Sequence, residues 1–378
     1  MKASESFDQY DAKDENFDAD RPLRRRSRSK KWIATAAVTL ILVLTGVALL
    51  FRQSRLSSRA PSETLVVPIV RESPVTRNEV SESQKPQTAN ERNTGPLNPA
   101  PDPRLVEQSR FGIIPKISSE GLKPFEIYSR PMVWSKIAGP ASPETDLRLV
   151  ESTNPKIGII VSGAGLSYLA TVEALIALPA NVTFAFSPYA NNAGSQVADA
   201  RRDGHEVMLE IPMDSLNPRL QDPGRMALLT ELETEQNLER LSWLMTRFTG
   251  YFATIPVMGE RFLSQPEKLS PIIQDLSKRG LAIVYATDSP ILEQLSHDFQ
   301  IPYARTTVQI DAELDPISIR NKLANLENAA KMNGYAIGIM RPISMTTRQL
   351  ETWIKSLADK AIELVPVSSI LVSRAKQK

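Results

Sequence analysis

Residues 157–167 read IGIIVSGAGLS, and this stretch decides the fold. Four of its first five residues are β-branched, which is typical of a buried strand. Gly163 and Gly165 then predict a tight turn, and an apolar pattern of helical period follows the turn. A strand, a turn and a helix in this order form the repeating unit of parallel sheets, which hold functional side chains at the carboxyl ends of their strands.

The same unit recurs along the rest of the chain. Strands are expected at 157–161, 182–186, 205–211, 251–255, 281–285, 302–306, 335–340 and 362–367. The clearest helical stripe lies in 227–248. Gly204, Gly280 and Gly334 each stand where a helix would end in a left-handed residue before the next strand. Repeated units of this kind indicate an α/β fold with a parallel sheet, either closed as a barrel or open and doubly wound.

The turn after the first strand matches no catalytic or nucleotide-binding motif. A dinucleotide-binding loop would need a glycine at Tyr168. A nucleophile elbow would need a glycine at Ile160, and neither histidine of the chain is placed to be the base for Ser162. The residues themselves therefore favour a tight turn, with Ser167 bonding to the local backbone.

Composition excludes several classes of site. The 378 residues include no cysteine and only two histidines, His205 and His297, so a zinc site built on Cys or paired His is nearly excluded. A formal net charge of +2 gives no indication of nucleic-acid binding. His205 begins the third expected strand, whereas Glu210 and Asp214 lie towards its carboxyl end. We therefore expect His205 to be structural and the two acids to lie near the functional face.

The N-terminal region predicts a membrane anchor. Residues 1–31 are polar, acidic at first and then basic, and are expected to form a disordered cytoplasmic tail. Residues 32–51 carry no charge and are long enough to cross a bilayer as one helix from Trp32 to Phe51. The preceding basic run predicts a single-pass protein of the inner (cytoplasmic) membrane, with a periplasmic or otherwise extracytoplasmic C-terminal domain. A cleaved signal peptide is the alternative, but its charged region would be unusually long.

Three further segments follow the expected membrane helix. Residues 52–103 are rich in Pro and Ser and are expected to be a disordered linker. Residues 104–155 contain apolar and aromatic clusters, so they are expected to dock on the domain as an extended arm, with a free linker as the alternative. The folded domain is expected at 156–374. The arm side chains expected to be buried are Phe111, Ile113, Ile114, Phe125 and Tyr128.

Short motifs spread over 156–372 together resemble those of the divergent polysaccharide deacetylase family. They are VSGAG (161–165), NVTFAFSPYA (181–190), ARRDGHEVMLEIPMD (200–214), VMGERF (257–262), KRGLAIVY (278–285), QID (309–311), GYAIGIMRP (334–342) and ELVPVSSI (363–370). The resemblance implies a distorted (β/α) barrel related to metal-dependent polysaccharide deacetylases. It also implies that the functional residues lie at the carboxyl ends of the strands.

The resemblance further implies that the metal-binding residues of the family are missing here. The aspartate pair that supplies a base and a metal ligand in the family is replaced by Ser162 and Gly163. Glu210 stands at the position of one family histidine, and Arg341 at that of another. These four positions are therefore degenerate, and no residue of the chain is assigned a catalytic role.

Two acids of the family pattern are retained, Asp214 and Asp311. We expect no cofactor and no metal ion. As a weaker alternative, Asp214, Asp311 and Glu210 could hold a divalent cation through oxygen atoms alone.

These features predict a glycan-binding or scaffold pseudoenzyme of the cell envelope. Aromatic faces and bidentate hydrogen-bonding groups recognise sugars, and the strand ends carry several of them. The candidate glycan-binding residues are Tyr189, Asn191, Asn192, Asp214, Tyr285, Asp311 and Arg341. The alternatives are an active hydrolase that removes acyl groups from N-acylated polysaccharide or peptidoglycan, and a non-enzymatic partner in envelope assembly. The expected partners are the membrane, an envelope glycan and envelope proteins, but not nucleic acid.

Overall fold

The computed structural model describes residues 95–130, 153–217, 220–286 and 288–376. The expected tail at 1–31, the expected membrane helix at 32–51, most of the expected linker and part of the expected arm (131–152) lie outside these ranges. Among the described residues, no helix is both long enough and apolar enough to cross a bilayer.

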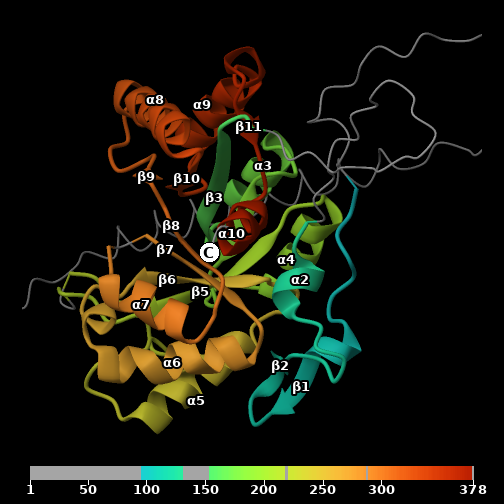
Figure 1. Cartoon of the computed structure of the whole chain (residues 1–378), viewed down its shortest axis with the longest axis vertical. Helices are drawn as coiled ribbons and strands as arrows, with labels where there is room; N and C mark the ends of the chain where they lie inside the picture. Colours follow the sequence, from blue (N-terminus) through green and yellow to red (C-terminus); the bar gives the residue numbers. More distant parts are fainter. Residues whose placement is uncertain (1–94, 131–152, 218–219, 287, 377–378) are drawn as a thin grey trace, which may run out of the picture. The chain divides into compact units, whose positions relative to one another are not determined.

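A parallel sheet in the order β8-β7-β6-β5-β4-β3-β10-β9 forms the centre of the domain, and β11 also pairs with β3 (Figure 1). Its strands are β3 (Lys156–Ala164), β4 (Thr183–Phe186), β5 (Val207–Met213), β6 (Ala253–Met258), β7 (Ala282–Tyr285), β8 (Tyr303–Arg305), β9 (Val308–Gln309), β10 (Tyr335–Met340) and β11 (Glu363–Leu364). The connecting helices are α3 (Tyr168–Ala177), α4 (Ala193–Arg202), α5 (Thr234–Met245), α6 (Pro266–Lys278), α7 (Pro290–Asp298), α8 (Pro316–Asn333) and α9 (Ser344–Lys355). A last helix, α10 (Val367–Lys376), follows β11.

Two consecutive threonines join the two edges of this sheet. The backbone N–H of Thr306 donates to the carbonyl of Tyr285 on β7 (2.9 Å), whereas that of Thr307 donates to the carbonyl of Ile337 on β10 (2.6 Å). Because β7 and β10 lie next to the edge strands β8 and β9, this dipeptide bridges the opening between the two edges and gives the sheet a barrel-like form. The prediction of an α/β barrel-like fold is therefore confirmed.

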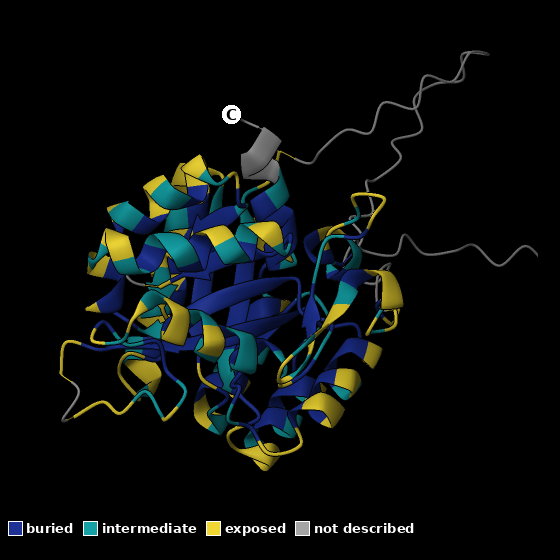
Figure 2. Ribbon diagram, turned by 90° about the horizontal axis from the view of Figure 1, so that it is seen from below, coloured by how far each residue is buried: buried dark blue, intermediate teal, exposed yellow. Residues whose placement is uncertain are grey.

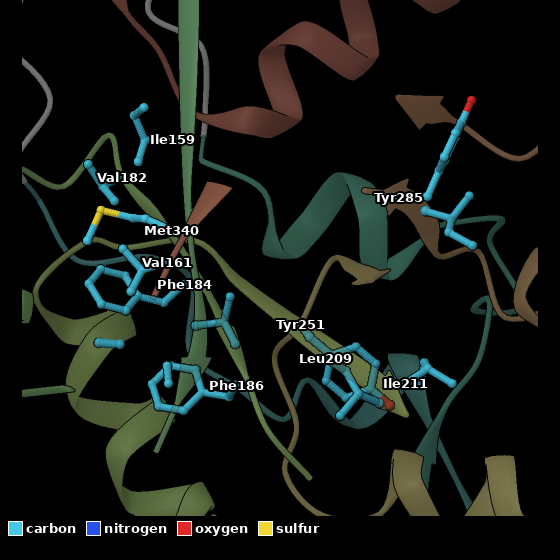
Figure 3. Close-up of a cluster of buried hydrophobic side chains, with 14 of the residues drawn as sticks. Ile159, Val161, Val182, Phe184, Phe186, Leu209, Ile211, Tyr251, Tyr285 and Met340 are labelled. Atoms are coloured by element: carbon cyan, nitrogen blue, oxygen red, sulfur yellow. The ribbon is translucent and has the colours of Figure 1, made fainter. Parts of the chain in front are cut away.

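Alternate strand residues face opposite sides of the sheet, as the two-residue period of a strand requires. One side packs on α3 to α9, with Ile159, Phe184 and Leu209 in the shared core (Figure 3). The other side, with Ile160 and Met208, packs on α10 and on residues of the arm. Figure 2 shows the buried sheet in dark blue, surrounded by helices whose outer faces are exposed. Both faces of the strands are thus buried, which explains their continuous apolar sequences.

The described part of the arm packs on the barrel. It contains a hairpin of β1 (Val106–Ser109) and β2 (Gly112–Pro115) and a short helix, α2 (Pro124–Tyr128). Ile114, Phe125 and Tyr128 are buried as expected, but Phe111 and Ile113 are exposed. Phe111 lies at the hairpin turn, and Ile113 precedes the inward-facing Ile114, so its side chain points outward.

The packed region begins before the boundary expected from composition. The expected linker includes residues 95–103, yet Leu97 is buried and its N–H donates to the carbonyl of Arg201 (3.0 Å). The buried guanidinium of Arg201 in turn donates to the carbonyls of Asn98 (2.6 Å), Tyr128 (3.2 Å) and Gly250 (2.7 Å). One arginine therefore links the start of the described chain, the arm and the loop before β6.

Some element boundaries differ from the expectation for local reasons. In 227–248 the helix begins only at Thr234, because Glu233 and Gln236 form a capping box there. The expected strand at 362–367 shortens to β11, since α10 begins at Val367. Gly204, Gly280 and Gly334 have φ of +91°, +67° and +79°, which confirms the left-handed conformation expected of them.

Candidate functional site

The turn quoted at the start lies at the carboxyl end of β3 and needs both of its glycines. Gly163 and Gly165 have φ of +79° and +86°. A Cβ atom at Gly165 would lie 2.4 Å from the Cβ of Ala190, in the loop after β4. Ser167 caps α3, as expected, by accepting from the N–H of Ala170 (3.5 Å). The glycines therefore allow the β3 and β4 loops to approach closely at this end of the barrel.

Glu210 of β5 reaches this turn across β4. Its Oε1 accepts hydrogen bonds from the Ser162 hydroxyl and from the Gly163 N–H, both at 2.6 Å. Burial raises the pKa of Glu210 to about 7, even though the two hydrogen bonds act in the opposite direction. The sequence offered Ser162 no histidine as a base, but the structure places a carboxyl group with a near-neutral pKa against its hydroxyl.

Asp311 and Arg341 form a second, separate group where β9 and β10 end. Asp311 is completely buried, and its Oδ2 accepts from the backbone N–H (3.0 Å) and the Nε (2.9 Å) of Arg341. The guanidinium also donates from Nη2 to the Asp311 carbonyl (3.0 Å), and Gln309 Nε2 donates to Oδ1 (2.5 Å). The carboxylate is thus enclosed by donors, one of which carries a full positive charge.

Asp214 forms a third group beside the end of β5. Its Oδ2 accepts from the Thr230 hydroxyl (2.7 Å) and lies 3.6 Å from Nη1 of Arg261. Within the described ranges, no three His, Cys, Asp or Glu residues come together in a way that could hold a metal ion. The three carboxylates proposed as oxygen ligands therefore have separate partners, and arginines beside Asp214 and Asp311 oppose a cation there.

The remaining glycan candidates differ in their accessibility. Asn191 and Asn192 are exposed in the loop after β4. Tyr189 is half-buried, its hydroxyl accepts from the Met226 N–H (3.2 Å), and its ring centroid lies 6.5 Å from that of Trp243.

Tyr285 is a correction to the expected set of glycan-binding residues. It is buried in the core between sheet and helices (Figure 3), because it shares the phase of Ile283 on β7 and points away from the barrel interior. It is therefore not accessible to a glycan at the strand ends.

Two arginines at the strand ends were not among the sequence candidates. Arg261 follows β6 and pairs with Asp214, and Arg305 of β8 pairs with Asp288 after β7 (2.6 Å). Both pairs join neighbouring strands of the sheet. Only the strand order brings these residues together, so no local pattern could have identified them.

Neither histidine belongs to the site. His205 is buried before β5, with Nδ1 2.9 Å from the Val182 carbonyl, and burial lowers its pKa. His297 lies in α7 with an exposed side chain, 3.7 Å from Asp298. His205 thus lies at the opposite end of β5 from Asp214, as the strand length predicted.

Comparisons with known proteins agree with the motifs. The chain is 24% identical to the uncharacterized protein YibQ of Escherichia coli (strain K12) over 203 residues, which cover 52% of this chain and 61% of the relative. A crystal structure of an uncharacterized protein from Agrobacterium tumefaciens C58 has a TM-score of 0.61 and 29% identity, covering 68% of this chain and 98% of the other. Residues 159–371 match the model of the family described as divergent polysaccharide deacetylase, and the chain belongs to this family.

Proposed function

We propose that this protein binds a glycan of the cell envelope at the carboxyl ends of its barrel strands and does not carry out metal-dependent deacetylation. The proposal rests on one observation: the side chains at the degenerate positions are already bonded to other residues of the chain. Glu210 is engaged by Ser162 and Gly163. Arg341 is engaged by Asp311. A cation at these positions would have to displace the chain's own hydrogen-bond donors, one of them positively charged.

Arg341 is the group most suited to a sugar. Asp311 fixes its guanidinium through Nε and Nη2, while the side chain remains 52% exposed. A guanidinium held in this way presents its other N–H groups in a fixed direction, which suits the hydroxyl groups of a saccharide. Asn191 and Asn192 could add amide donors and acceptors from the loop after β4.

Binding is tested on the purified full chain with N-acetylglucosamine tetramer (chitotetraose) in isothermal titration. We expect saturable binding that Arg341→Ala abolishes. Arg348→Ala is the matched control, because its side chain on α9 is 74% exposed and paired only loosely with Glu173 (3.8 Å). If the wild type binds no glycan, or if both variants bind equally, the proposal is wrong and an envelope-assembly role becomes the better account.

The active-hydrolase alternative is separated by metal content and deacetylation. We expect no stoichiometric zinc and no release of acetate from chitotetraose or peptidoglycan fragments. Ser162→Asp with Gly163→Asp should not create activity, because Glu210 and Arg341 still occupy histidine positions and Gly163 has a left-handed φ. One tightly held metal, lost together with hydrolysis in Glu210→Ala/Asp214→Ala, would instead establish a carboxylate metal site.

We also propose the membrane anchor at 32–51 with an extracytoplasmic domain. The support is the uncharged apolar run preceded by basic residues. A periplasmic reporter fused after Lys378 should be active, and a cytoplasmic reporter at the same place inactive. The opposite result would refute this topology.

A further inference from the structure

The large exposed hydrophobic side chains gather at one end of the barrel. Eight of the twelve in the described residues follow the carboxyl ends of strands: Leu166, Tyr168, Leu169, Leu216, Leu220, Leu314, Ile317 and Met345. The other four are Phe111 and Ile113 on the arm hairpin, and Ile176 and Met332 at the far ends of α3 and α8. Single exposed hydrophobic residues are common on protein surfaces and need no explanation. What needs one is that eight of them lie around the same strand ends that hold Ser162.

These eight residues occupy only one part of the rim of the barrel. They follow β5, β3, β10 and β9, which lie in one continuous half of the strand order, with β4 among them. The carboxyl ends of β6, β7 and β8 and the loops after them contribute none of the eight and instead carry Arg261, Asp288 and Arg305. We call these two parts of the rim the aliphatic arc and the polar arc.

Three Asp–Arg pairs lie in or next to the polar arc. Asp288–Arg305 (2.6 Å) lies within it. Asp214–Arg261 (3.6 Å) spans its junction with the aliphatic arc between β5 and β6, and Asp311–Arg341 (2.9 Å) lies within the aliphatic arc, after β9 and β10, beside the other junction. The three arginine side chains are 52%, 47% and 52% exposed, respectively. Each guanidinium thus lies beside one carboxylate, with hydrogen bonds to it at Arg305 and Arg341, and is still open to a ligand hydroxyl or anionic group.

We propose that this rim binds an amphiphilic saccharide, one that carries a fatty acyl chain beside its sugar. This inference rests on the proposed glycan-binding function. Seven of the eight hydrophobic residues are Leu, Ile or Met, which suit a hydrocarbon chain, whereas sugar faces prefer aromatic rings. A bare sugar would leave the aliphatic arc in water, and a bare acyl chain would leave the polar arc unused. Because the two arcs share one rim, the ligand that fits both has a hydrocarbon chain and a sugar.

The test uses the absence of cysteine from the chain, which allows one labelled site per variant. The full chain is reconstituted in nanodiscs with a polarity-sensitive fluorophore on Leu169→Cys. Ile176→Cys is the matched control, because the two side chains lie at opposite ends of α3 and are 79% and 80% exposed. The probes are chitotetraose, chitotetraose with one N-octanoyl chain, and octanoate.

We expect the acylated probe to shift the emission of the Leu169→Cys label to the blue at a concentration at least tenfold below that for either other probe. The Ile176→Cys label should not respond. Leu166→Ser with Leu314→Ser should raise the half-saturating concentration of the acylated probe about tenfold, the ratio that 1.4 kcal/mol represents. Met332→Ser, at the far end of α8, should leave it unchanged.

The outcomes separate this inference from the proposed function. If chitotetraose binds and the acyl chain adds nothing, the amphiphile is wrong and the glycan site stands. If neither saccharide binds, both proposals fail. If the Leu169→Cys and Ile176→Cys labels respond equally, the probe simply partitions into lipid, and the inference is overturned. If octanoate gives the same response as the acylated saccharide, the site binds hydrocarbon alone, which also overturns the inference. A blue shift that grows with protein concentration in the absence of probe would assign the aliphatic arc to a second copy of the chain and overturn it too.

Discussion

Glu206 and Glu210 lie at opposite ends of the same strand region, both facing the inside of the barrel, and both are buried. Glu206 accepts from the N–H of Arg130 (2.6 Å), the Thr183 hydroxyl (3.3 Å), and both the N–H (3.2 Å) and hydroxyl of Ser368. Among the described residues, Glu210 accepts from two donors, both at the end of β3, and through one oxygen.

The two carboxyl groups connect different parts of the chain. Glu206 joins the end of the described arm, β4 and the first turn of α10, which are far apart in the sequence. Glu210 joins β5 to the end of β3 across β4, next to a half-buried serine. The amino end of the barrel is therefore held together by its buried acid, whereas the acid at the carboxyl end has few partners and lies beside the proposed ligand site. Four substitutions test this division.

The largest effect is expected from Glu206→Ala. It leaves the donors of Arg130, Ser368 and Thr183 buried without an acceptor, and each unpaired buried donor costs about 1–3 kcal/mol, so we expect a total loss of about 3–5 kcal/mol in the free energy of unfolding. Urea unfolding followed by circular dichroism measures it. Glu206→Gln, which keeps one acceptor, should lose less. If Glu206→Ala lowers the free energy of unfolding no more than Glu210→Ala does, the two ends of the barrel do not differ as described.

Arg201→Met tests the other buried link at the amino end. It removes the donors to the carbonyls of Asn98, Tyr128 and Gly250, so we expect a loss of about 2–4 kcal/mol. Limited proteolysis should show cleavage in residues 95–130 before cleavage of the barrel. Arg202→Met is the control. The side chain of Arg202, next to Arg201 in the sequence, is exposed, so its loss should change neither the free energy of unfolding nor the order of proteolysis. Equal proteolysis of the two variants would contradict the role of Arg201.

Glu210→Gln sharpens the comparison through pH. The folded-state pKa of Glu210 is about 7 and the ordinary value is 4.5, so between these pH values the folded chain keeps a proton that the unfolded chain loses. Its contribution to stability is therefore full below pH 4.5 and is lost as the pH rises through 7.

The wild type should lose about 1–3 kcal/mol more than Glu210→Gln between pH 4.5 and 8, because one pKa unit corresponds to about 1.4 kcal/mol. Other titrating groups are common to both proteins and cancel in the difference. Denaturant unfolding at a series of pH values provides the measurement. Parallel pH profiles would show that Glu210 has an ordinary pKa in the folded chain.

The smallest effect is expected from Gly163→Ala. Its φ of +79° disfavours a side chain, but the only atom near a new Cβ is Leu166 Cδ1 at 3.8 Å, so the cost should be about 1 kcal/mol. Gly165→Ala should cost clearly more, because its Cβ would lie 2.4 Å from that of Ala190. Thermal unfolding compares the two. The reverse order would mean that the turn is constrained at Gly163 instead.

The sequence predicted the units of the fold better than their mutual placement. The β-branched run at 157–161 and the glycines at 204, 280 and 334 act locally, through side-chain shape and left-handed backbone. The contact of Ser162 with Glu210 depends on β4 lying between β3 and β5, which no local pattern specifies. Tyr285 was misplaced for a related reason, since the register of β7 decides which face its side chain takes.

The dipeptide Thr306–Thr307 has a consequence for how the protein behaves at high local concentration. Edge strands of a sheet expose unpaired N–H and C=O groups that can recruit strands from other molecules. Here the edge strands β8 and β9 are three and two residues long, and the N–H groups of the two threonines between them are already bonded to the neighbouring strands β7 and β10. The central sheet thus offers neighbouring copies little to extend, so crowding the domain should not lead to aggregation through its edges.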